Sequence, residues 1–134
     1  MTITRFHVQQ PPGSSLCGQA CVAMILGIRL EHATSLVGHT RSTKPYELAD
    51  ALRKREIKCG DRRIRYTGGT LPKRAFLAIS AWNSRRRYHW VLLYDGLVYD
   101  PALCAPMPVR GYLRCNDGLG DNLDLTSYLP IGEV

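Results

Sequence analysis

The stretch SSLCGQACVAMILG, residues 14–27, predicts a helix that begins at a cysteine. The turn-forming segment PPGSS (11–15) precedes it, and Ser14 or Ser15 is suited to cap its first turn. Apolar residues then recur at the spacing of one helical face, namely Cys17, Ala20, Cys21, Met24, Ile25 and Ile28. Gly27 is expected near the end of this helix.

Two more helices are expected before the pattern changes. EHATSLVG (31–38) predicts a short helix that stops at Gly38. TKPYEL (43–48) has the form of a helix start, with Thr43 as the cap, a proline in the first turn and Glu47 as the capping partner. The segment 61–70 is basic and then glycine-rich, and its type stays open between strand and loop.

Beyond residue 72 the pattern is that of strands. The apolar runs AFLAISAW (75–82) and YHWVLLYD (88–95) predict two strands joined by the polar connection NSRRR (83–87). Asp95-Gly96 predicts a tight turn into a returning strand, LVYD (97–100). TSYLPI (126–131) is expected as an edge strand. Helices followed by antiparallel strands predict an α+β fold.

Length and composition predict one globular domain over residues 1–134. The chain has 45% hydrophobic and 22% charged residues, so wholesale disorder is not expected. No apolar run approaches the roughly 20 residues of a membrane span, and MTITRFHVQQPP (1–12) lacks the pattern of a secretory signal. We therefore expect a cytoplasmic protein as synthesised, with no membrane association, and leave non-classical export open. The cysteines, at 17, 21, 59, 104 and 115, are expected to be reduced.

The chain is basic, with a net charge of +7 from 18 Lys and Arg against 11 acidic residues. Much of the excess lies in 53–65 and in the Arg85-Arg86-Arg87 triplet. Such a surface could meet an acidic protein partner, although a merely solvated face is the simpler interpretation. Nucleic acid is not favoured as a partner, because aromatic residues do not alternate with the basic ones.

Cys17 is the candidate nucleophile. A helix N-terminus lowers the pKa of a thiol through its unpaired N–H groups and its dipole. Cys21 lies one turn further along, where that effect has faded, and is expected to be core. A metal or redox pair of Cys17 and Cys21 is the weaker alternative, because no second Cys/His pair of comparable spacing follows. We expect no metal and no cofactor.

His89 and Asp100 are the candidate partners of Cys17. A cysteine nucleophile needs a base, which is usually a histidine oriented by a third polar group. His89 stands at the start of an apolar strand, and Asp100 ends the next strand. If the Asp95-Gly96 turn folds that strand back, Asp100 returns to the level of His89.

Taken in order, QPPGSSLCGQACVAMILG, TRSTKPYELADALRKREIKC and HWVLLYDGLVYDP resemble segments of the papain-like cysteine peptidases of the C39-like group, the bacteriocin-processing type. The resemblance covers roughly residues 9–101. It implies a papain-like fold, with N-terminal helices packed on a C-terminal antiparallel sheet and the catalytic cysteine at the start of the first helix. It also implies a bacterial source.

The resemblance implies a role for each matching residue. Cys17 would be the nucleophile, His89 the general base and later acid, and Asp100 the group that orients the imidazole. A glutamine ahead of the cysteine would donate its amide to the oxyanion, together with the Cys17 backbone N–H. The usual spacing places that glutamine six residues before the cysteine, where this chain has Pro11, so Gln10 is preferred and Gln9 stays open.

Other residues near these motifs are candidates for contact with substrate. Gly18 would leave room for the substrate carbonyl, and Tyr88 would line the cleft. Trp90 is included with them, although packing in the core or over the catalytic ring is the more natural role for it. Gln19 is expected to face away from the site. The remaining histidines, His7, His32 and His39, are expected to be surface or capping residues.

These observations predict a cysteine peptidase or related amide-bond hydrolase that acts on a protein or peptide through a thioester acyl-enzyme. Glutamine deamidation or transamidation would use the same acyl-enzyme and stays open, as does a non-catalytic protein-binding module with a basic surface. Double-glycine leader cleavage in the C39 group takes place on transporters. Because this sequence contains no membrane span and no ATPase module, a stand-alone enzyme is expected.

Overall fold

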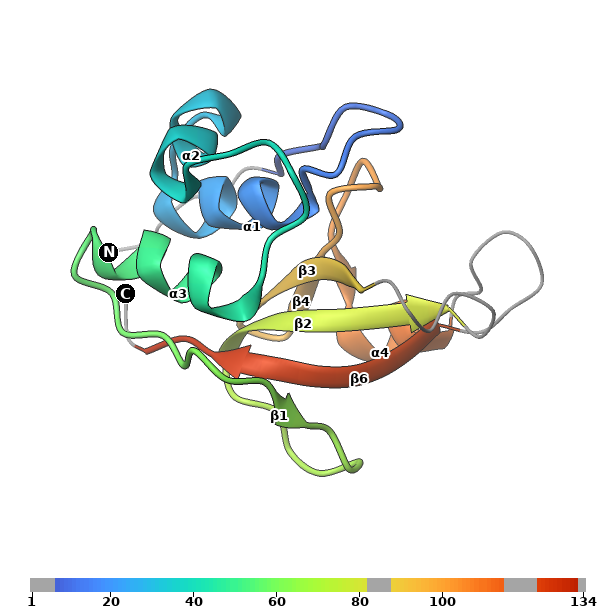
Figure 1. Cartoon of the computed structure of the whole chain (residues 1–134). Coiled ribbons are helices and arrows are strands. Elements are labelled where there is room, and N and C mark those ends of the chain that lie inside the picture. The colour runs from blue at the N-terminus through green and yellow to red at the C-terminus, as the bar shows by residue number, and fades with distance from the viewer. Residues whose placement is uncertain (1–6, 82–87, 115–122, 133–134) are drawn as a thin grey trace.

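Three helices lie on one face of a six-stranded antiparallel sheet, and a fourth helix lies on the other face (Figure 1). The computed structural model describes residues 7–81, 88–114 and 123–132. Its helices are α1 (Cys17–Leu26), α2 (Leu30–Val37), α3 (Pro45–Arg53) and α4 (Val109–Arg114). Its strands are β1 (Ile64–Arg65), β2 (Arg74–Ala81), β3 (His89–Tyr94), β4 (Leu97–Tyr99), β5 (Met107–Pro108) and β6 (Leu123–Pro130).

The first helix is buried along almost its whole length. Every residue from 17 to 25 is buried, because α1 lies between the other two N-terminal helices and the sheet. The helix ends as predicted at Gly27, whose φ of 68° lies in the left-handed region that glycine adopts readily. The predicted serine cap is wrong: the N-cap is Leu16, and no side chain bonds the first turn.

The third helix begins one residue later than predicted. Its N-cap is Lys44 rather than Thr43, and Pro45 is the first helical residue. Glu47 caps the start as predicted, since its Oε1 accepts the Lys44 backbone N–H at 2.8 Å. The loop through residues 42–45 therefore enters the helix with a fixed direction, which matters for the site below.

The sheet has the order β1-β6-β2-β3-β4-β5. β6 was expected at an edge, and this prediction is wrong: β6 pairs with β2 along most of its length, and the two-residue strand β1 covers its other side. Both faces of β2 are buried, because alternate residues enter the core under the helices or the core under α4. The predicted connection 83–87 lies outside the described residues.

The β3–β4 hairpin follows the prediction. Asp95 and Gly96 both have positive φ, 49° and 87°, as a type I′ turn requires. Leu92 pairs with Tyr99 across the hairpin, so the chain returns to the start of β3 directly after β4. Within the described residues no single helix is long and apolar enough to span a membrane, and α1 and α2 reach that length and composition only as a pair bent by 110°.

Candidate active site

Two cysteines of α1 contact the backbone of one residue of β3. The Trp90 backbone N–H donates to Sγ of Cys17 at 3.4 Å. One helical turn further, the Cys21 thiol donates to the Trp90 carbonyl at 3.5 Å. Cys17 therefore lies beside the first residues of β3, where His89 is found.

His89 is held between Cys17 and Asp100. Its Nε2 donates to Oδ1 of Asp100 at 2.5 Å, which leaves Nδ1 as the nitrogen for its hydrogen bond with the Cys17 thiol. The tight turn thus brings Asp100 to His89 as predicted. These three residues come from the start of α1, the start of β3 and the end of β4.

Asp100 is 6% exposed and is held by several further contacts. Its Oδ1 also accepts the Ala102 backbone N–H at 2.8 Å. Its Oδ2 accepts the hydroxyl of Tyr112, on α4, at 2.7 Å. The ring of His7 donates to the Asp100 carbonyl at 2.8 Å. The carboxylate that faces His89 is therefore held in orientation by Ala102 and Tyr112.

The electrostatics of this group favour a thiolate–imidazolium pair. Burial works against the charged form of His89, but its hydrogen bonds to Asp100 and Cys17 outweigh burial and raise its pKa to about 10. Burial likewise opposes ionisation of Cys17, yet His89 and the backbone N–H groups of Trp90 and Gly18 bring its pKa below the ordinary value. By contrast, burial raises the pKa of Cys21 well above that value.

Cys17 and His89 line a cleft of about 630 Å³. Its other walls come from the segment before α1, the loop that enters α3, and the segment before β1. The lining residues are Gln10, Ser14, Ser15, Cys17, Ser42, Thr43, Lys44, Pro45, Arg63, Tyr88, His89 and Trp90. A peptide chain in this cleft would reach the sulfur of Cys17.

Of the three glutamines considered, only Gln10 lies in the cleft. Its Nε2 donates to the Ser14 carbonyl at 3.0 Å, and its Oε1 is buried without a hydrogen-bond partner among the described residues. Gln9 is exposed. Gln19 faces the opposite way, as predicted, and donates to the carbonyls of His39 and Arg41 at 3.0 and 2.9 Å.

The structure explains the need for glycine at position 18 differently from the prediction. A Cβ on Gly18 would lie 2.0 Å from Oγ1 of Thr43, so the missing side chain makes room for the loop before α3 and not for a substrate carbonyl. Trp90 is 3% exposed and donates its indole N–H to the Thr43 carbonyl at 3.1 Å, which is the core role expected for it. Tyr88 is 41% exposed on the cleft wall.

Several contacts around the site were missed from the sequence. Nothing in the local pattern marks Tyr112 as a partner of Asp100, because the two residues lie in different elements. His7 was expected at the surface, yet it contacts Asp100. His39 was expected to be a surface or capping residue, and its Nε2 donates to Glu47 at 2.5 Å.

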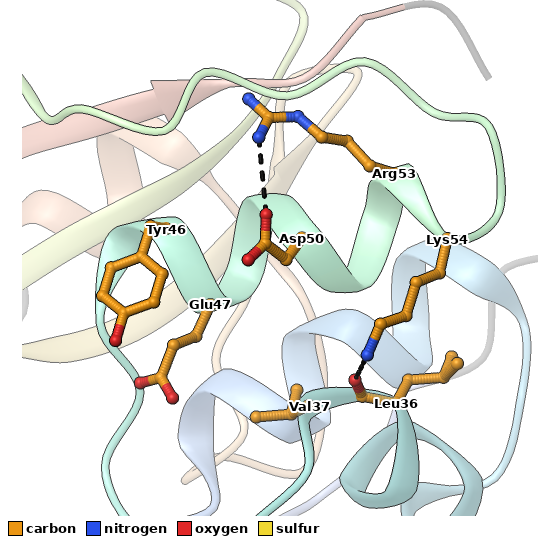
Figure 2. A pocket seen from close by; sticks show the side chains of 7 residues that line it. All are labelled: Leu36, Val37, Tyr46, Glu47, Asp50, Arg53 and Lys54. Carbon is orange, nitrogen blue, oxygen red and sulfur yellow. Dashed lines mark hydrogen bonds and ion pairs between the residues drawn. The ribbon is translucent and has the colours of Figure 1, made fainter.

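A second hollow, of about 520 Å³, lies between α2 and α3 (Figure 2). Its lining contains no cysteine and no histidine. Arg53 is paired with Asp50 at 3.4 Å, and Lys54 donates a hydrogen bond to the Leu36 carbonyl at 2.6 Å. Among the described residues, no group of three or more His, Cys, Asp and Glu side chains is placed to hold a metal.

Comparison with known proteins supports the fold. No family model and no curated protein matches the sequence. Among solved structures, the chain is similar to a double glycine motif protease from an AMS/PCAT transporter, which was crystallised in complex with the leader peptide. The TM-score is 0.58 at 19% identity, over 98% of this chain and 97% of the protease chain. This likeness confirms the expected fold, with N-terminal helices packed on a C-terminal antiparallel sheet.

Proposed function

We propose that this protein is a cysteine peptidase that cleaves peptide bonds through Cys17, His89 and Asp100. The observation that carries the proposal is the chain of contacts from the Cys17 thiol through the His89 ring to the buried carboxylate of Asp100, at the wall of an open cleft. The pKa of His89 is raised and the pKa of Cys17 is lowered, and these are the directions that such chemistry needs. The fold shared with a protease supports the same reading.

In the proposed first half-reaction, the Cys17 thiolate attacks the substrate carbonyl carbon and forms a C–S bond. The carbonyl π electrons move onto oxygen, which gives a tetrahedral oxyanion. When this collapses, the C–N bond breaks, and the imidazolium of His89 gives its Nδ1 proton to the departing amine. The products of this step are a free amine and a thioester on Cys17.

In the second half-reaction, water attacks the thioester while the neutral His89 ring takes one of its protons. The C–S bond then breaks, the acid product leaves, and the thiolate–imidazolium pair is restored. Asp100 holds Nε2 throughout, which keeps Nδ1 directed at the sulfur. Because Asp100 is itself fixed by Tyr112 and Ala102, the ring can turn little between the two steps.

The oxyanion of the tetrahedral intermediate needs hydrogen-bond donors, and this proposal assigns two. The backbone N–H of Cys17 is among the unpaired donors of the first turn of α1. Gln10 lies in the same cleft, and its amide is the second donor in this proposal. Gln10 stands seven residues before Cys17, and its position in the lining of the same cleft supports this assignment.

The proposal is tested by alkylation with iodoacetamide at pH 6, with each cysteine quantified by mass spectrometry. Cys17 should react selectively, and the substitution His89→Ala should abolish that selectivity. Cys104 is exposed and controls for access alone. Equal labelling of Cys17 and Cys104 would contradict the proposal.

Activity is then measured on a proteome-derived peptide library, with products read by mass spectrometry. New termini that require Cys17 identify peptide-bond cleavage, whereas a mass change at glutamine without a new terminus identifies deamidation. The variant Cys17→Ala is the matched control. Products unchanged in that variant would rule out Cys17 as the nucleophile.

A further inference from the structure

The wall of the cleft around Cys17 is cationic. Its lining includes Lys44 and Arg63, and no Asp or Glu is among the twelve described residues that line it. The carboxylate of Asp100, next to His89, is buried and paired with that residue. Because the thiolate and imidazolium cancel, the two basic side chains leave the cleft with a net positive charge.

Within the part of the chain that the structure describes, neither cation forms a close ion pair with a carboxylate. Among the described residues, no carboxylate oxygen lies within 4.0 Å of the charged nitrogens of Lys44 or Arg63. The hollow between α2 and α3 is different, since Arg53 there pairs with Asp50 (Figure 2). Two cations without a close carboxylate partner in the described structure therefore line the cleft that holds the reactive sulfur.

Arg63 is also oriented. Its guanidinium carbon lies 4.3 Å from the centre of the Tyr88 ring, so the planar group rests on an aromatic face. Tyr88 directly precedes His89 and is 41% exposed in the cleft. Stacking holds the guanidinium by its face and leaves the N–H groups at its edge free for a planar carboxylate.

We infer that Arg63, seated on Tyr88 and assisted by Lys44, forms a subsite for an aspartate or glutamate side chain of the substrate, close to the bond that is cut. This inference rests on the proposed peptidase function and names its substrate class: peptides with an acidic residue beside the scissile bond. A carboxylate is the group that pairs with a guanidinium through two parallel hydrogen bonds. The aromatic support lowers the entropy lost when Arg63 is fixed by substrate.

The first test compares peptides in pairs. From the library products, the best acidic substrate is resynthesised with Asn or Gln in place of the acidic residue. The wild type should prefer the acidic peptide by about tenfold in kcat/KM, and Arg63→Glu should abolish or reverse that preference. The control is Lys58→Glu, which changes the net charge by the same amount. A preference unaltered by Arg63→Glu would overturn the subsite.

Lys58 is a suitable control because it lies at the other end of the sheet. Its carbonyl accepts the Gly132 N–H, and the neighbouring Ile131 N–H bonds the carbonyl of Arg74, the first residue of β2. His89 instead pairs with Ile79, near the end of β2. Lys58 therefore lies away from the cleft by most of the length of β2.

The second test needs no peptide substrate, and so it separates failure of the subsite from failure of the peptidase proposal. Cys17 is alkylated with iodoacetate, which is anionic, and with iodoacetamide, which is neutral and of similar size. Arg63→Glu should lower the ratio of the two rate constants at Cys17 by about fivefold or more, because it replaces an attractive charge by a repulsive one. Lys58→Glu should change that ratio by less than about twofold, since its charge is distant and screened.

The two measurements have distinct outcomes. An equal ratio in both charge variants overturns the cationic subsite, whether or not any peptide is cleaved. A lowered ratio supports it even if the library yields no product, a result that would count against the peptidase alone. Stronger protection of Cys17 by a single-stranded oligonucleotide than by the acidic peptide would overturn the assignment to peptides.

Discussion

The hydroxyl of Tyr112 donates a 2.7 Å hydrogen bond to Oδ2 of Asp100, the oxygen that does not face His89. Tyr112 is 1% exposed, so this bond is sheltered from water. It helps to keep the pKa of Asp100 below its ordinary value, against the opposing effect of burial. A helix on the far face of the sheet thereby contributes to the charge that holds His89 protonated.

Tyr112→Phe should reduce kcat/KM by roughly three- to tenfold, the size expected for one hydrogen bond to a charged group. Without the hydroxyl the pKa of Asp100 rises and its hold on His89 weakens, so Cys17 is less readily ionised. The acid limb of the Cys17 alkylation rate should move to higher pH. Tyr128→Phe, in the same apolar cluster, should leave that limb in place. A purely structural role for Tyr112 would lower stability and leave the pH profile unmoved.

The raised pKa of His89 predicts that part of the stability of the fold is lost in base. The native chain keeps the His89 proton up to about pH 10, whereas the unfolded chain loses it at the ordinary pKa of 6.5. Because the native chain binds the extra proton between these values, the contribution of His89 is full below pH 6.5 and is lost as pH rises through about 10.

The lowered pKa of Cys17 acts with the opposite sign. Its contribution is full above the ordinary thiol pKa of 9.0 and is lost as pH falls through the lower native pKa. The free energy of unfolding is measured with urea for the wild type and for His89→Gln. The difference between them should fall as pH rises from 9.0 to 10, where Cys17 contributes in full and His89 loses its part. A difference that rises across that interval would contradict the ion pair.

Gln10→Ala should lower kcat by roughly 10²- to 10³-fold, the usual effect of removing one oxyanion donor. Gln9→Ala should have little effect, because that side chain is exposed and does not line the cleft. The rate of Cys17 alkylation should be similar in both variants, since neither change touches the thiolate. Equal kcat values in the two variants would remove Gln10 from the proposed mechanism.

Gly18→Ala should destabilise the protein by about 1–3 kcal/mol, because the new methyl group would overlap Oγ1 of Thr43. Thr43→Ala alone should be mild, since that buried oxygen has no hydrogen-bond partner among the described residues. The double variant should recover part of the loss, as a double-mutant cycle in urea would measure. Additive effects would mean that the two side chains do not meet.

Local patterns were sufficient for much of the fold. The end of α1 at Gly27, the cap of α3 by Glu47 and the Asp95-Gly96 turn each depend on residues close in sequence, and each was predicted. The meeting of His89 with Asp100 could be predicted for the same reason, because a tight turn of known length sets the register of the two strands.

Contacts between distant segments could not be predicted in this way. The pairing of β6 with β2 joins residues about fifty positions apart, and an alternating pattern does not say whether a strand is central or peripheral. The sequence did not show that Gly18 lies against Thr43, because these two residues belong to different segments of the chain. Its small size was therefore interpreted as room for substrate. No sequence pattern indicates the hydrogen bond of Tyr112 to Asp100, because that bond depends on how α4 packs against the sheet.

The backbone of Trp90, in the sheet, contacts both Cys17 and Cys21, in the first helix. Cys17 belongs to the helical layer and His89 to the sheet, so the contact between them exists only while the two layers are packed together. Slight sliding between the layers would separate sulfur from imidazole while every helix and strand stayed intact. The alkylation rate of Cys17 therefore reports on the packing of the helices against the sheet. With increasing temperature or denaturant, that rate should fall before circular dichroism records any loss of secondary structure.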